Sequence, residues 1–261
     1  MTEPLRWDRM TVNEIRDAMT KTSTVLIPMG CVEQHGYHLT TRTDSLSAET
    51  IADGASGRTG AIVAPTYPYT YSGGELPGTI NISPSVVGLF VSEILRELSR
   101  QGWRNLVIVL GHGGTENDAA VQGAADIFLR THPERGHVNV AVYRFWQVSE
   151  SARRAYEDHD YHAGYFETSM MLYMAPDQVR DELVLDQPAL VDRMREDPDS
   201  YQTRVKNVDH EAVLPHIHQD PQTKVGVIGD PSRASRELGK QLIEEAVEGL
   251  VELVGAMQQA G

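Results

Sequence analysis

The feature that most constrains the fold is an uninterrupted apolar run between two amphipathic segments. The run Asn105–Leu110 is preceded by a predicted helix over Pro84–Gln101 and followed by another over Glu116–Thr131. Pro84 suits a first helical position and Gly102 a helix end. A short run that is apolar on both faces is typical of a central strand in a parallel sheet with helices on both sides.

The rest of the chain continues this alternation of strands and helices. Alternation of this kind favours an α/β fold of three layers (α/β/α) with a mostly parallel central sheet. We expect one domain spanning residues 1–261. Further strands are predicted over Thr24–Pro28, Ala61–Pro65 and Val138–Tyr143, and further helices over Met10–Lys21, Ser45–Ala55, Thr168–Met174 and Glu237–Met257.

Two regions have no clear periodicity. Thr66–Thr79 is rich in Tyr, Gly and Pro and is expected to be a long loop. Pro176–Asp230 is expected to be an extended excursion that covers a site or packs against a neighbouring subunit. At the start of the helix predicted over Ser45–Ala55, either Asp44 or Ser45 is available as the N-cap.

Composition excludes several classes of protein. The chain has 261 residues and a net charge of −14 without a basic stripe, which argues against nucleic acid or an anionic membrane as the main partner. Cys31 is the single cysteine, so no intrachain disulfide can form and a reducing compartment is expected. No apolar signal core or membrane-length apolar run is present, and we therefore expect a cytoplasmic protein.

The segment after the first predicted strand carries residues that bind metals. Glu33, His35 and Asp44 follow Thr24–Pro28 closely. Sites in α/β proteins form beyond the carboxyl ends of strands, and carboxylates and imidazoles are ligands for zinc, manganese and iron. Glu33 and His35 are two residues apart, so in an extended segment they point the same way. A polar surface loop could hold the same residues, but matching motifs elsewhere favour a metal site.

Two further motifs supply similar residues. His112 follows the strand 105–110 in a glycine-rich turn that lacks the nucleotide-binding patterns GxGxxG and GxxxxGK[ST]. A structural histidine in a tight turn would fit this segment equally well. His162 is a candidate general acid or base, because histidines ordinarily titrate near neutrality. Glu167 either completes a metal shell or only stabilises the amino end of the next helix, where a negative charge is electrostatically favourable.

Together, the three segments offer enough ligands for two metal ions that share one carboxylate. Two ions roughly 3.5–4 Å apart can activate one water molecule and polarise a carbonyl group. The sequence therefore predicts hydrolytic chemistry.

These motifs, in this order, resemble the creatininase (creatinine amidohydrolase) family over nearly the whole chain. The matching segments are 26–44, 72–79, 111–114, 162–169 and 226–234. The resemblance implies a creatininase-type fold, a small-molecule substrate and a homo-oligomer, most often a hexamer. It also implies two divalent ions, Zn, Mn or Fe, with Glu33 and His112 on one ion, His35 on the other and Asp44 bridging them.

The resemblance leaves two candidates for the remaining ligand. In creatininase a glutamate follows the histidine of the second loop closely, which points to Glu116, whereas the third motif offers Glu167. Glu116 is also a candidate catalytic residue. His162 matches the family's proton-transfer histidine. The residues expected to contact the substrate are Trp146, Gly113 and Ser72.

Departures from the family pattern concern the substrate. Leu110 and Thr115 stand where the family often has asparagine, and Asp158 and Tyr161 lie near the position of a pocket tryptophan in creatininase. We therefore expect the metal chemistry without the creatininase substrate.

The expected reaction is hydrolysis of a C–N bond in a small polar cyclic amide or related compound, by a hydroxide held between the metals that attacks a carbonyl. The alternatives are hydrolytic C–C ring opening of a cyclic keto-sugar of the inosose type, a metal-dependent isomerase or lyase, and a binding protein without activity.

Several other residues suggest chemistry but have simpler explanations. Cys31 is expected to have a packing role. His216 and His218 are expected on the surface or at an interface, and His159 either lines the pocket or lies outside it. Alternating tyrosines at 67, 69 and 71 fit a pocket wall or a half-buried strand.

Overall fold

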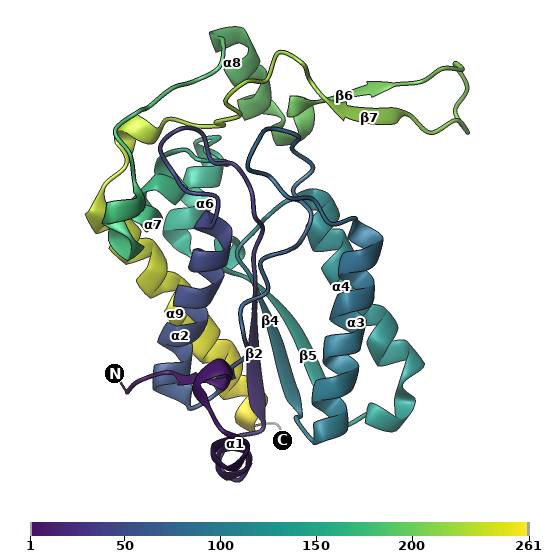
Figure 1. Ribbon diagram of the computed structural model, residues 1–261, viewed down its shortest axis with the longest axis vertical. Helices are drawn as coiled ribbons and strands as arrows, with labels where there is room; N and C mark the ends of the chain where they lie inside the picture. The colour runs from purple at the N-terminus through teal and green to yellow at the C-terminus, as the bar shows by residue number, and fades with distance from the viewer. Residues whose placement is uncertain (1, 260–261) are drawn as a thin grey trace.

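The central sheet of the computed structural model, which describes residues 2–259, has five strands that all run parallel (Figure 1). Their order is β1-β3-β2-β4-β5. The predicted α/β fold with a mostly parallel sheet is confirmed. The strands are β1 (Leu5–Arg6), β2 (Thr24–Met29), β3 (Ile62–Val63), β4 (Asn105–Leu110) and β5 (Asn139–Arg144).

Helices cover both faces of the sheet and give three layers (Figure 1). One face carries α2 (Thr43–Thr59), α6 (Glu150–Glu157), α7 (Tyr165–Met174) and α9 (Arg236–Gln259). The other face carries α3 (Pro84–Gln101) and α4 (Thr115–Thr131). The remaining α-helices are α1 (Val12–Met19), α5 (Phe145–Val148) and α8 (Pro188–Glu196), and 3-10 turns occupy Trp7–Arg9, Pro133–Arg135, Pro176–Gln178, Pro198–Tyr201 and Pro231–Arg233.

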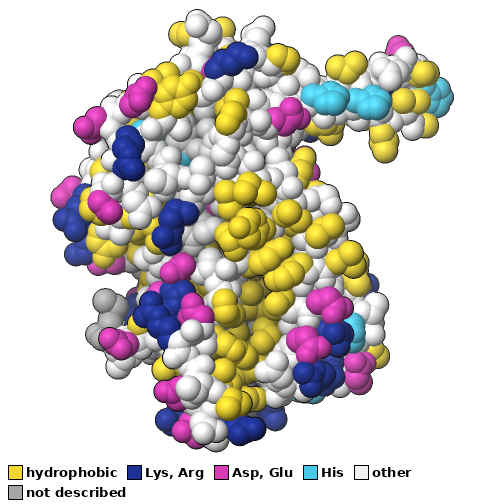
Figure 2. All heavy atoms as spheres, in the orientation of Figure 1, with side chains coloured by type: hydrophobic (Ala, Val, Ile, Leu, Met, Phe, Trp, Pro, Cys, Tyr) yellow, Lys and Arg dark blue, Asp and Glu magenta, His cyan; other side chains and the backbone are white. Residues whose placement is uncertain are grey.

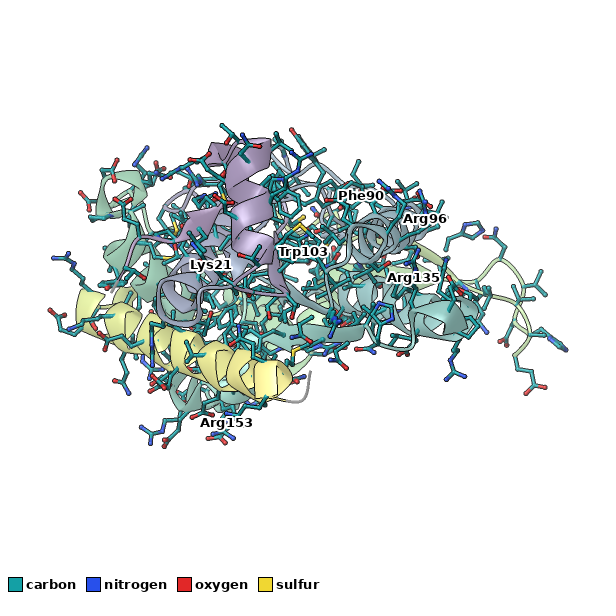
Figure 3. All side chains as sticks on the ribbon, turned by 90° about the horizontal axis from the view of Figure 1, so that it is seen from below. Lys21, Phe90, Arg96, Trp103, Arg135 and Arg153 are labelled. Carbon is teal, nitrogen blue, oxygen red and sulfur yellow. The ribbon has the colours of Figure 1, made fainter. Side chains whose placement is uncertain are left out.

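Strand β4 explains why the central run is apolar throughout. Successive side chains of a strand point to opposite faces, so Val107 and Val109 pack into the core beneath α2 and α9, while Leu106 and Ile108 pack beneath α3 and α4. All four are buried. Just before β4, Trp103 is buried in the core beneath α3 and α4, at the end of the sheet where β4 begins (Figure 3).

The predicted ends of most elements agree with the structure, and α2 differs most. The bounds of α3 and β4 are as predicted, but α2 begins at Thr43 with Arg42 at its N-cap. The prediction that Asp44 or Ser45 is the N-cap is therefore wrong. Asp44 lies inside the first turn, where its carboxylate faces two histidines instead of the helix backbone.

The irregular region 176–230 crosses above the carboxyl ends of the strands (Figure 1). It contains α8 and an antiparallel hairpin of β6 (Gln202–Val205) and β7 (His216–Gln219). The hairpin projects as an arm that carries exposed histidines and apolar residues (Figure 2). None of the helices within residues 2–259 is both long and apolar enough to cross a membrane.

Candidate metal centre

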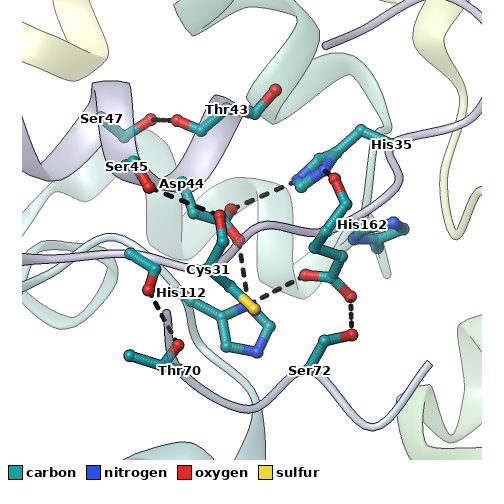
Figure 4. Close-up of polar contacts among 12 residues, drawn as sticks. Cys31, His35, Thr43, Asp44, Ser45, Ser47, Thr70, Ser72, His112 and His162 are labelled. Carbon is teal, nitrogen blue, oxygen red and sulfur yellow. Dashed lines mark hydrogen bonds and ion pairs between the residues drawn. The ribbon is translucent and has the colours of Figure 1, made fainter. Parts of the chain in front are cut away.

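Two groups of possible metal ligands meet at Asp44, at the carboxyl edge of the sheet. One group is Glu33, Asp44 and His112, and the other is His35, Asp44 and Glu167. Asp44 Oδ1 lies 3.2 Å from His35 Nε2, and Asp44 Oδ2 lies 3.3 Å from His112 Nδ1. Figure 4 shows Asp44 between the two imidazoles. The structure thus brings together five of the residues that the sequence predicts as metal ligands.

Two glycines allow α2 to deliver Asp44 to this position. A side chain at Gly30 would bring its Cβ within 2.4 Å of the Ser45 backbone, and one at Gly111 would lie 1.9 Å from the Asp44 carbonyl oxygen. Each glycine directly follows a strand, β2 or β4. The first turn of α2 can therefore rest on the strand ends only because these positions lack a Cβ.

A backbone hydrogen bond fixes the ring of His35. His35 Nδ1 lies 3.0 Å from the carbonyl oxygen of Glu33, which can only accept, so Nδ1 carries the proton. Burial would lower the pKa of His35, but the carboxylates of Asp44 and Glu167 outweigh burial and raise it, so both ring nitrogens are protonated without a metal ion. In the neutral ring, Nε2 has the lone pair and points at Asp44 and Glu167, at 3.2 and 3.4 Å. This tautomer is the one that a metal ligand requires.

Ser72 orients the carboxylate of Glu33. Its hydroxyl donates to Glu33 Oε1 at 2.6 Å, while Glu33 Oε2 lies 3.0 Å from His112 Nδ1 (Figure 4). The Ser72 backbone is in turn held by Asn81 Oδ1, which accepts from the Ser72 amide at 2.9 Å. Ser72 is therefore a support of a ligand as well as a residue of the cavity wall.

Glu167 reaches the cluster from the first turn of α7. Its Oε2 accepts a hydrogen bond from the Ala163 amide at 2.7 Å. Ala163 has a φ of 53°, a left-handed conformation that is strained for a residue with a Cβ. This bent segment sets His162 and Glu167 against the His35 loop.

Asp160 anchors the same bend and was not singled out by the sequence. Its buried carboxylate accepts from the amides of Tyr165, Phe166 and Asp230, at 2.9–3.0 Å. Burial nevertheless raises the pKa of Asp160. The sequence offers one signal for this role, because Asp160 comes shortly before the helix predicted over Thr168–Met174.

The charges in the cluster are strongly coupled. Burial alone would raise the pKa of Glu33, but the imidazoles of His112, His162 and His35 outweigh burial and lower it. The pKa of Asp44 is likewise lowered by His35 and His112 against the effect of burial. Carboxylates that stay ionised in a buried site can ligate cations.

Unsatisfied polar atoms converge on the same points. Glu33 Oε2, His35 Nε2 and Asp44 Oδ2 are buried, and among the described residues their polar neighbours are only other members of the cluster. Buried polar atoms without partners are rare and need an explanation such as an ion. The donor set, three carboxylates and two imidazoles, suits zinc, manganese or iron.

The two candidates for the last ligand lie in different places. Glu167 belongs to the His35 group, whereas Glu116, in the first turn of α4, lines the cavity above and is in none of the ligand groups found within residues 2–259. The glycine turn 111–114 carries Glu116 away from the cluster.

The cavity lies directly over the cluster. It has a volume of about 900 Å³ including the part open to solvent. Gly113, Ser72 and His162 line it, as expected, and the excursion contributes Asp199 and Tyr201. The prediction that the excursion covers a site is therefore confirmed. Residues that the sequence did not single out also line the wall, notably Gln34, Tyr156 and Thr223.

Trp146 is expected from the sequence to contact the substrate, but it lies behind the cavity wall. It is not part of the cavity wall and packs instead against both hydrophobic cores. A Cβ built on Gly113 would lie 3.6 Å from Trp146 Cζ2, so the indole supports the glycine turn from behind.

The other residues that suggested chemistry in the sequence do not line the cavity. Cys31 is fully buried, and burial, more than any other effect, raises the pKa of its thiol to about 12, which fits a packing role. His159 lies outside the cavity wall, and His216 and His218 lie on the exposed arm. The ring of Tyr67 stacks on that of Phe90, with 3.7 Å between the ring centroids.

Comparison with known proteins identifies the family. The sequence profile described as "Creatininase: Creatinine amidohydrolase" matches residues 8–254. The chain is 28% identical over 247 residues to "Creatinine amidohydrolase" of Pseudomonas putida, covering 88% of each chain. It is 30% identical over 243 residues to "Mycofactocin precursor peptide peptidase" of Mycolicibacterium smegmatis, covering 90% of this chain and 85% of that one.

Solved structures agree with the sequence comparison. A structure titled "Creatininase Mn" has a TM-score of 0.77 at 27% identity, and a mutant creatininase of "Zn-Zn type" has a TM-score of 0.78 at 26% identity. Each comparison covers 98% of this chain and 99% of the other. With the family profile covering nearly all of its length, this chain belongs to the creatininase family of metal-dependent hydrolases.

Proposed function

We propose that this chain uses two divalent metal ions to hydrolyse an amide or related C–N bond, cyclic or open, in a small polar molecule. The observation that carries the proposal is the sharing of Asp44 by two ligand groups, in which Glu33 Oε2, His35 Nε2 and Asp44 Oδ2 have no polar neighbour outside the cluster among the described residues. Glu33 and His112 would hold one ion, His35 and Glu167 the other, and Asp44 both. Bound there, two ions activate water and polarise a carbonyl group.

His162 is the residue best suited to move a proton. Its Nε2 lies 2.8 Å from the Gln34 carbonyl oxygen, which can only accept, and 3.2 Å from Gln34 Nε2, which can only donate. The shorter contact favours a proton on Nε2, which leaves Nδ1 as the nitrogen free to exchange one. Its ring centroid lies 4.4 Å from that of His35, and His162 lines the cavity. We propose that His162 delivers a proton to the leaving nitrogen after the carbonyl is attacked.

The substrate differs from that of creatininase in this account. Glu116, Thr115 and Tyr161 line the cavity at or near positions where the sequence departs from the family pattern. The cavity therefore keeps the proposed metal ligands on its floor, whereas residues of its wall differ from the family pattern.

A homo-oligomer is part of the proposal. Helix α3 exposes apolar side chains, with Leu89 68% and Val86 49% exposed, next to an apolar surface in Figure 2. Burial of such a surface against other copies would be favourable. Light scattering on purified protein would decide between a monomer and the hexamer that the family resemblance favours.

Hydrolysis is tested with metal-loaded protein and a panel of lactams, formamides and small linear amides in ¹⁸O-labelled water. The expected result is release of an amine, with label in the new carboxylate. An Asp44→Asn variant should lose turnover, and Asp126→Asn on the exposed side of α4 should keep it. Product formed without label would contradict hydrolysis and favour an isomerase or lyase.

A further inference from the structure

The charged side chains that line the cavity are all acidic, apart from histidine. Glu33 and Glu167 sit at the floor with the other ligands, and Glu116 and Asp199 lie higher in the wall. No lysine or arginine of the described chain lines the cavity. Building on the proposed function, we propose that Glu116 and Asp199 form a subsite for a positively charged group of the substrate, an ammonium or guanidinium.

The carboxylates in the cavity wall differ from those at its floor in how their negative charge is neutralised. Two divalent ions would outweigh the three carboxylates of Glu33, Asp44 and Glu167. Glu116 and Asp199, in contrast, form no ion pair with a basic side chain within the described part of the molecule. The charge of these two carboxylates is therefore available to a ligand.

Two separate segments bring these carboxylates to the cavity. Glu116 is in the first turn of α4, and Asp199 comes from the excursion. Thr115 Oγ1 lies 3.5 Å from Asp199 Oδ2, so the two segments come close together at the cavity wall. The amino end of α4 contributes a partial charge of roughly +0.5, which offsets only part of two negative charges.

Neighbouring groups also favour a cation with N–H donors. The phenols of Tyr156, Tyr161 and Tyr201 line the cavity, and aromatic rings attract cations. Burial, and then the charges of Glu33 and Glu116, raises the pKa of Tyr201, so its phenol stays neutral. Thr223 also lines the cavity; it is only 3% exposed, and its hydroxyl has no hydrogen-bond partner within residues 2–259. It can accept from a bound N–H group.

The test uses hydroxamates, which chelate metal ions and need no turnover. A series of aminoalkyl hydroxamates of increasing chain length is compared with alkyl isosteres in which methyl replaces ammonium. Affinities for the zinc-loaded protein are measured by calorimetry. At least one chain length should favour the ammonium compound by about tenfold, a preference that falls as salt is added.

Variants assign the preference to the named side chains. Glu116→Gln and Asp199→Asn should each reduce the ratio of the two affinities several-fold, whereas Asp126→Asn, which removes the same charge further along α4, should leave the ratio unchanged. Circular dichroism and zinc content confirm that each variant is folded and loaded.

Two contrary outcomes are distinguishable. If the protein binds zinc and hydroxamates but every ammonium compound binds no better than its isostere, or if Glu116→Gln keeps the preference, the subsite is overturned while the metal centre stands. If the protein takes up no zinc, the proposed function is overturned and the subsite falls with it.

Discussion

At the scale of single residues, the site depends on contacts that fix one atom of each ligand. His35 gives one ring nitrogen to a backbone carbonyl, and Glu33 gives one oxygen to Ser72. The opposite atom of each side chain then faces only other members of the cluster within the described chain. Ligands held in this way lose little freedom when an ion binds, which favours binding.

Ser72→Ala tests this support. Removing the hydroxyl frees Glu33 Oε1, and metal affinity should fall by about 10- to 100-fold, the usual effect of losing a hydrogen bond to a ligand. Competition with a fluorescent chelator measures the affinity. Ser92→Ala on α3, where the hydroxyl bonds only to the Gly88 carbonyl, is the matched control. Equal affinities for both variants would contradict the role assigned to Ser72.

Asp160→Ala tests the anchor of the bend before α7. Three backbone amides lose their acceptor, so the free energy of unfolding should fall by about 2–4 kcal/mol. Urea unfolding followed by circular dichroism measures the change. Asp160→Asn keeps one acceptor oxygen and should cost less than Asp160→Ala. A loss below about 0.5 kcal/mol for Asp160→Ala, the range of ordinary surface changes, would show that the bend is held elsewhere.

At the scale of elements, close approach of backbones determines where ligands stand. Helix α9 packs on α7, and a Cβ at Gly239 would lie 1.8 Å from the Ser169 carbonyl oxygen. Because α7 carries Glu167, this contact also sets the height of one ligand above the sheet.

Two glycine substitutions on α9 should have opposite effects. Gly239→Ala forces α9 away from α7 and should cost about 1–3 kcal/mol of stability. A Cβ at Gly255 on the same helix meets no atom of residues 2–259 within 4 Å outside its own helix backbone, so Gly255→Ala should stabilise the protein by about 0.5–1 kcal/mol, because alanine favours helix. Thermal unfolding of both variants provides the comparison, and a stabilising Gly239→Ala would refute the close contact.

The elements also differ in how far the sequence determines them. Strand β4 and helix α3 were predicted to the residue, because each has a strong period and clear ends. Strand β1 has only two residues and no local signal, so its pairing with β3 depends on contacts made after folding. The excursion could be predicted only as irregular, since its short elements are stabilised by other segments and not by their own pattern.

The same distinction applies to the site. That Glu33, His35 and His112 lie together could be predicted because each follows a strand closely and is confined to one edge of the sheet, and Asp44 lies in the first turn of the helix that comes after the same loop as Glu33 and His35. The choice between Glu116 and Glu167 could not be made, because it depends on how far a glycine turn carries the chain. Side chains of the wall, such as Tyr201 and Thr223, come from segments without periodicity and were missed.

At the scale of the whole molecule, the metal centre joins four parts of the chain. Its proposed ligands come from the loop after β2, from α2, from the loop after β4 and from α7. Two ions bound to these ligands would stabilise the folded state, because the unfolded chain cannot present the ligands together.

Metal removal should therefore lower the thermal stability. At a free metal concentration of 100 times the dissociation constant, binding contributes about 2.7 kcal/mol per site and about 5.4 kcal/mol for two sites, which corresponds to roughly 10–20 °C in Tm for a chain of this size. Scanning calorimetry with and without chelator measures the shift. Asp44→Asn should show little or no shift; a full shift in that variant would mean that the ions bind elsewhere.

The most direct test of the central claim is elemental mass spectrometry of the purified, reconstituted protein and three variants. We expect about two first-row transition metal ions per chain in the wild type and in Glu116→Gln, about one in Glu167→Gln, and fewer than one in Asp44→Asn. Consistent absence of metal from the wild type, or loss of metal in Glu116→Gln but not in Glu167→Gln, would contradict the proposed centre.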